Sequence, residues 1–96
     1  MAKVIVQDVY DVIGLGNIVL CYIKEGTLRV GMVTKYKNYV LRVAMIESKN
    51  ERKEYAEEKE LCGVKLIPNE FSLADIFFGK GEKIVKELKG VLLEFS

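Results

Sequence analysis

The chain contains no histidine and only two cysteines, Cys21 and Cys62. Histidine is the commonest general base and the commonest metal ligand, so its absence removes the usual candidate for both roles. The two cysteines lie far apart and form no Cys-x-x-Cys pair, which argues against a zinc site. We expect two buried thiols inside the fold, with a disulfide between them as the alternative.

A long apolar run and a strong charge of one sign are also missing. No apolar run approaches about 18 residues, so we expect no segment that spans a membrane. The N-terminus lacks the apolar region and cleavage site of a signal peptide, which favours a cytoplasmic protein. Fifteen basic and fourteen acidic residues give a net charge of +1. Strong binding to duplex nucleic acid is therefore not expected, although a local basic face remains compatible with this balance.

The motifs of common catalytic sites are absent as well. The sequence has no Gly-x-Ser-x-Gly nucleophile motif and no Gly-x-x-x-x-Gly-Lys-Ser/Thr phosphate loop, and Gly79–Lys83 does not supply one. Asp8 and Asp11 flank a predicted strand end, where turn hydrogen bonding is their expected role. We expect no enzymatic activity, no GTP binding, no metal and no cofactor.

What the sequence does contain is enough apolar material for one small domain. Half of the 96 residues are apolar, which is typical of a chain that folds around a modest core. The charged residues are mostly Lys and Glu, a balance typical of proteins from hot environments. We therefore expect a single domain over residues 1–96.

Short β-branched runs separated by turns predict an all-β fold. The expected strands span residues 3–13 with a break near Asp8, 18–23, 32–36, 39–47, 61–67 and 91–95. Lys37-Asn38 is a candidate hairpin turn. Along 39–47, simple alternation divides the residues into two faces: Tyr39, Leu41, Val43 and Met45 on one, and Val40, Arg42, Ala44 and Ile46 on the other. Six short strands with glycine turns favour a small closed Greek-key barrel.

Two segments depart from this strand pattern. Residues 48–60 are intensely charged and have only a thin apolar stripe, so we expect a solvated hairpin or loop there. The run could also serve as an electrostatic docking arm. Residues 68–81 read as an insertion with a possible helical turn at 72–77. This insertion either covers an apolar outer face of the barrel or forms a docking element itself.

The glycine turns carry a family resemblance. The pattern begins with four short segments, which are Asp8-Val9-Tyr10, Gly14-Leu15-Gly16, Lys24-Glu25-Gly26 and Leu28-Arg29-Val30-Gly31. Two further segments follow, at Val43–Glu47 and Cys62–Leu66. This pattern resembles the second domain of translational GTPases such as elongation factor Tu. The resemblance implies a six-stranded Greek-key barrel, here freestanding, and contacts with RNA or the ribosome. The chain departs from the family by lacking the GTPase domain, by Leu15 where an Arg is frequent, and by Cys21 where a Gly is usual.

Two surfaces are candidates for binding. Lysines near tyrosines suit single-stranded RNA, because rings stack on bases and cations pair with phosphates; this set is Arg29, Lys35, Tyr36, Lys37, Tyr39 and Arg42. An outward apolar face suits a protein partner or a second copy of the chain; this set is Ile18, Leu20, Tyr22, Phe77 and Phe78. The resemblance favours a binding module that contacts RNA or a ribonucleoprotein, and the alternative is a protein-interaction or self-assembly module.

Overall fold

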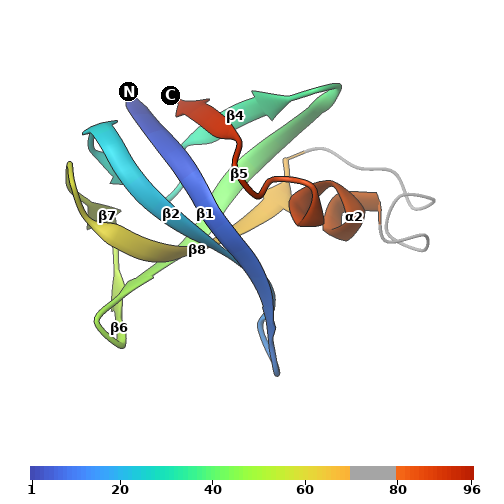
Figure 1. Cartoon of the computed structure of the whole chain (residues 1–96), viewed down its shortest axis with the longest axis horizontal. Coiled ribbons are helices and arrows are strands. Elements are labelled where there is room, and N and C mark those ends of the chain that lie inside the picture. Colours follow the sequence, from blue (N-terminus) through green and yellow to red (C-terminus); the bar gives the residue numbers. More distant parts are fainter. Residues whose placement is uncertain (70–79) are drawn as a thin grey trace.

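A computed structural model of the chain describes residues 1–69 and 80–96 and confirms the all-β fold (Figure 1). The expected helical turn at 72–77, together with Phe77 and Phe78, lies outside the described residues. The elements in chain order are β1 (Ala2–Val12), β2 (Gly16–Gly26), β3 (Leu28–Arg29), β4 (Val33–Tyr36), β5 (Tyr39–Ser48), β6 (Glu51–Lys53), β7 (Tyr55–Ala56), β8 (Leu61–Pro68), α2 (Lys80–Lys86) and β9 (Leu92–Phe95).

Six antiparallel strands form a nearly closed barrel in the order β4-β5-β8-β2-β1-β9. The first and last strands of this order, β4 and β9, meet where Val33 lies beside Ser96, the residue after β9. Val33 N–H donates to the Ser96 carbonyl at 2.9 Å, and Ser96 N–H donates to the Val33 carbonyl at 3.0 Å. Closure pairs the edges of the sheet, which would otherwise expose unpaired backbone groups.

The longest ladder joins β1 to β2, and its far end leaves the barrel (Figure 1). A register shift between Val6 and Asp8 confirms the expected break in β1. The connecting turn contains Gly14 at φ 85° and leads into Gly16 at φ 79°, a region that favours glycine. We call residues Asp8–Ile18 the β1–β2 arm.

The barrel interior is filled by alternate residues of the strands. Val19, Cys21 and Ile23 of β2 are fully buried and alternate with the outward candidates Ile18, Leu20 and Tyr22. Cys21 lies directly opposite Cys62 in the ladder between β2 and β8, and both thiols are free. The expectation of two buried thiols is therefore confirmed for this structure.

The expected face of Ile46 was wrong because β5 contains a bulge. The register against β8 shifts between Val43 and Met45, so alternation restarts one residue later. Ile46 consequently joins the core and is fully buried, while Met45 is 9% exposed. One extra residue in a strand has this effect because successive side chains point to opposite faces.

The charged segment 48–60 forms the predicted hairpin. β6 pairs with the end of β5, and the turn between them places Lys49 and Asn50 at positive φ. The sequence did not predict α2, which begins at Lys80, within the last residues of the expected insertion 68–81. Its Ile84 and Val85, with Leu88 just beyond it, join the core cluster, and the helix contacts β1, β2 and β8.

Candidate protein-interaction face

The outer surface of the barrel is apolar where four neighbouring strands meet. In one row, Leu92 of β9 pairs with Ile5 of β1, Ile5 pairs with Tyr22 of β2, and Tyr22 pairs with Leu61 of β8. The outer faces of exposed sheets are usually polar, so four apolar residues side by side are unusual. Leu61 and Leu92 are 53% and 50% exposed.

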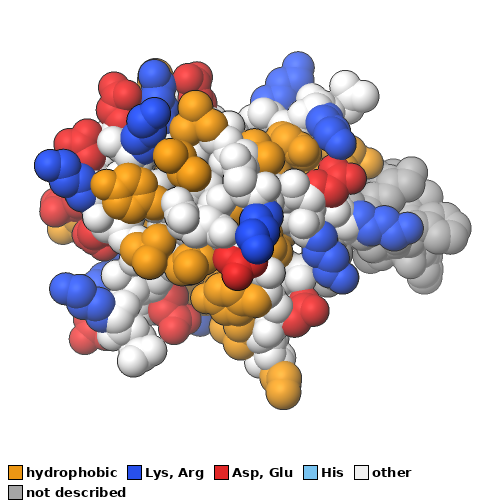
Figure 2. Space-filling model, in the orientation of Figure 1, with side chains coloured by type: hydrophobic (Ala, Val, Ile, Leu, Met, Phe, Trp, Pro, Cys, Tyr) orange, Lys and Arg blue, Asp and Glu red, His pale blue; other side chains and the backbone are white. Residues whose placement is uncertain are grey.

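This apolar surface continues along the β1–β2 arm. Leu20 lies beside Gly63, and Tyr10 lies beside Ile18. Figure 2 shows hydrophobic side chains gathered over β1 and β2. We call this surface the outer apolar face, and its members are Ile5, Tyr10, Val12, Leu20, Tyr22, Leu61 and Leu92, with Ile18 beneath them.

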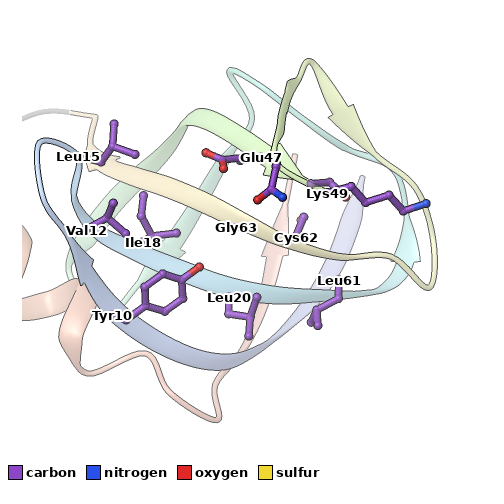
Figure 3. A pocket seen from close by; sticks show the side chains of 12 residues that line it. Tyr10, Val12, Leu15, Ile18, Leu20, Glu47, Lys49, Leu61, Cys62 and Gly63 are labelled. Carbon is purple, nitrogen blue, oxygen red and sulfur yellow. The ribbon is translucent and has the colours of Figure 1, made fainter.

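Ile18 is buried although it points away from the barrel interior. It is 4% exposed, because the Tyr10 side chain extends from β1 over β2 toward Gly63 of β8 (Figure 3). A Cβ at Gly63 would lie 3.1 Å from Cγ2 of Ile18 and 3.6 Å from the Tyr10 hydroxyl oxygen. Gly63 therefore provides space, and an aromatic ring packed over a strand glycine compensates for the missing side chain.

A hollow of about 270 Å³ lies between the arm and the β5–β6 turn (Figure 3). Tyr10, Ile18, Leu20 and Leu61 form its apolar walls, and its polar rim comes from Glu47, Ser48, Lys49 and Asn50. A second, shallower hollow adjoins it, because Leu20 and Leu61 line both. Small-molecule sites commonly enclose about 300–1,000 Å³ and contain polar groups that converge on the ligand. This hollow is smaller and its polar groups lie on the rim, so it suits protruding side chains of a macromolecule better.

Charged residues lie both within the outer apolar face and along one of its borders. Within it, Asp8 of β1 lies directly opposite Leu20 of β2, and its carboxylate is 3.8 Å from the Lys89 ammonium group. Lys3 lies one row beyond Ile5, and its ammonium group is 3.7 Å from Glu25 and 3.8 Å from Glu94. A mainly apolar surface with a few charged residues in and around it is compatible with a protein–protein interface.

The structure does not gather the candidate RNA-binding residues on one surface. Lys35 and Arg42 share the outer face of β4 and β5, where Lys65 of β8 joins them. Tyr36 and Tyr39 pack against the core instead. Arg29 lies elsewhere, with its guanidinium 5.5 Å from the centre of the Tyr55 ring.

Lys37 also belongs to the inner, tyrosine-bearing side of that hairpin. Its ammonium group is 5.5 Å from the Tyr36 ring centre and 2.9 Å from a Glu87 carboxylate oxygen. The hydrogen bond to Glu87, followed by its negative charge, raises the pKa of Lys37. This lysine therefore already has an anionic partner, and a phosphate would have to displace it.

The candidate protein-interaction residues lie closer together. Ile18, Leu20 and Tyr22 alternate along β2, with Ile18 buried and the other two half-buried. Phe77 and Phe78 lie outside the described residues. Their part in this surface stays a prediction.

Sequence reasoning missed Tyr10, Leu61 and Leu92 as members of this face. Tyr10 could have been found, because a hairpin centred on Gly14 places it opposite Ile18. The positions of Leu61 and Leu92 on this face depend on how strands distant in the sequence pair with one another. Alternation within a single strand does not reveal such pairings.

The buried cysteines are poorly suited to chemistry. Burial and the neighbouring Cys62 raise the pKa of Cys21. Burial, followed by the charge of Glu60, raises the pKa of Cys62 to about 12. Since the thiolate is the reactive and metal-binding form, both sulfurs are held in the unreactive state near neutral pH.

Comparison with known proteins assigns no family: no family model matches the chain, and no curated protein matches it. The described residues contain no cluster of three or more potential metal ligands of the His, Cys, Asp and Glu types. Within residues 1–69 and 80–96, no helix has the length and apolar character needed to cross a bilayer.

Proposed function

We propose that this barrel is a non-catalytic protein-binding module and that the outer apolar face is its contact surface. The observation that carries the proposal is the row Leu92–Ile5–Tyr22–Leu61, which brings four apolar side chains together on the outside of four strands. Burying one large apolar side chain contributes about 1.5–3 kcal/mol, so a few such residues can dominate a small interface.

A relation to the translational GTPases is the finer part of this proposal. Support comes from the turn glycines of the resemblance, because Gly14, Gly16, Gly26 and Gly31 all have positive φ. If this relation holds, the chain uses a translation-factor type of barrel as a scaffold. Its outer apolar face then replaces contacts that neighbouring domains make in the complete factors.

An RNA-binding role is the second candidate, and one observation favours it. Lys35, Arg42 and Lys65 share one outer surface, and none forms an ion pair with another described residue. No tyrosine of the candidate set shares that surface, since Tyr36 and Tyr39 pack on the core side. Phosphate contacts alone, without stacking, give weak and strongly salt-dependent binding.

Affinity capture from a lysate of the source cells distinguishes these two functions. The bait is the full chain, compared with Leu61→Asp on the outer apolar face and Val40→Asp beside Lys35 on the outer face of β4 and β5, both at exposed positions. We expect capture of a protein that resists ribonuclease, is lost with Leu61→Asp and persists with Val40→Asp. The RNA-binding function would be established instead by two results together: ribonuclease abolishes the capture, and the Lys35→Glu/Arg42→Glu variant captures nothing.

A further inference from the structure

The β1–β2 arm has two strand edges without neighbours in the described part of the chain. The outer edge of β1 is bonded as far as Val6, which pairs with Gly90 and Val91 beyond the β1–β9 ladder, and the pairing of β2 with β8 ends at Val19. Beyond these points, and within residues 1–69 and 80–96, Asp8–Val12 and Gly16–Ile18 pair only with each other. A projecting two-stranded ribbon is marginally stable by itself, and its free backbone groups favour pairing with another strand.

The arm has an apolar tip, and an apolar hollow lies along one of its sides. Ile13 at the turn is fully exposed, and Figure 2 shows a hydrophobic side chain at the free end of the hairpin. The hollow of about 270 Å³ extends along one side of the arm, where Val12 and the turn residue Leu15 line it together with Tyr10, Leu20 and Leu61. One chain thus carries both an apolar projection and an apolar recess.

The arm and the recess rim each carry an exposed charge, and these two charges are opposite in sign, while the rim also holds the half-buried Glu47. Between Val4 and Ile23 the only charged residues are Asp8 and Asp11. Asp8 lies 3.8 Å from the Lys89 ammonium, whereas Asp11 is exposed near the tip. Across the recess, Lys49 is exposed on the rim, with Glu47 the acidic lining residue.

The geometry points to a second copy of this chain as the occupant of the recess. Two copies related by a twofold axis place each arm over the other copy's recess, so every contact occurs twice. Ile13 of one copy enters the apolar recess of the other, and Asp11 of the first pairs with Lys49 of the second. This inference rests on the proposed function, because it assigns the outer apolar face to a particular partner.

The test measures the association of the full chain by sedimentation velocity and light scattering over a wide concentration range. We expect a reversible dimer. Ile13→Asp weakens it at least about tenfold, and folding is preserved because Ile13 lies in an exposed turn. Val40→Asp, an apolar-to-acidic change at another exposed position, leaves association unchanged.

A charge exchange tests the orientation of the two copies. Asp11→Lys alone and Lys49→Asp alone each weaken the dimer, and the double variant recovers part of the loss, as a direct pair requires. A wild-type chain that stays monomeric at every concentration overturns the inference, and so does a dimer that neither Ile13→Asp nor the charge exchange affects. If the chain is monomeric but Leu61→Asp still abolishes capture of another protein, the self-association fails and the proposed function stands.

Discussion

Val33 and Ser96 exchange two backbone hydrogen bonds, and this pair joins the last strand of the barrel to β4. Ser96→Pro removes the donor of one bond without changing the carbonyl that accepts the other. We expect the free energy of unfolding to fall by about 1–3 kcal/mol, because the carbonyl of half-buried Val33 loses its hydrogen-bond donor. Urea titration measures the loss, and faster amide hydrogen exchange at Val33 locates it.

The matched control for barrel closure is Ser96→Ala. It retains both backbone groups and changes only an exposed side chain, so its effect should stay within about 0.5 kcal/mol. Equal effects of the two variants would show that these bonds do not hold the barrel closed.

Gly26 and Gly14 both have positive φ, at 79° and 85°, but their surroundings differ. A Cβ at Gly26 would collide with the backbone carbonyl oxygen of Met1, whereas a Cβ at Gly14 would have no atom within 4 Å. We expect Gly14→Ala to cost about 1–2 kcal/mol through backbone strain alone. Gly26→Ala should cost about 2–5 kcal/mol, because overpacking adds to the strain. Thermal and urea unfolding of the two variants measure the difference, and equal losses would exclude a role for the collision.

The cysteine pair predicts a loss of stability at high pH. In the unfolded chain these thiols ionise near the ordinary value of 9.0, while burial raises the pKa of Cys62 to about 12 in the folded state and also raises that of Cys21. Between about pH 9 and 12 the unfolded chain therefore binds fewer protons than the folded chain. Stability is fully present below pH 9 and decreases as pH rises, by up to about 1.4 kcal/mol per pH unit for each thiol.

The control for this pH dependence is the Cys21→Ala/Cys62→Ala variant, measured by urea unfolding at several pH values. Its stability should decline less steeply than that of the wild type over the same range. Rapid alkylation of both thiols in the folded protein at pH 8 would contradict the burial argument, since alkylation requires the thiolate.

Helix α2 provides a fourth prediction. A helix of seven residues is not stable in isolation, so its packing against the barrel must stabilise it. Leu88 directly after the helix is fully buried, and Leu88→Ala should lower the free energy of unfolding by about 2–5 kcal/mol. Lys86→Ala, at an exposed position of the helix, should change it by no more than about 0.5 kcal/mol. Calorimetry of both variants decides whether α2 is an integral part of the core.

Local patterns in the sequence predicted the strands well. Alternation, the turn at Gly14 and the break near Asp8 located β1 and β2, because these features depend on neighbouring residues. The bulge that turns Ile46 inward depends on how β5 packs against β8, and no local signal marks it. Helix α2 was missed for a similar reason, since its apolar residues are buried by strands distant in sequence.

The two candidate surfaces also differ in how well the sequence predicted them. The Ile18, Leu20 and Tyr22 series follows from alternation within one strand, and the structure places these residues on one outer face. The proposed RNA set was assembled by residue type along the chain. Its members separate in the structure because Tyr36 and Lys35 are neighbours in β4 and therefore point to opposite faces.

The pairing of Ala2 with Phe95 places the two ends of the barrel sequence on adjacent antiparallel strands. A force that pulls these ends apart acts along the hydrogen bonds between β1 and β9, because such bonds run perpendicular to antiparallel strands. The ladder would therefore open one rung at a time, beginning beside Ser96, instead of shearing all its bonds together. As a mechanical element this barrel should be compliant when it is stretched through its ends, whatever its stability toward heat or urea.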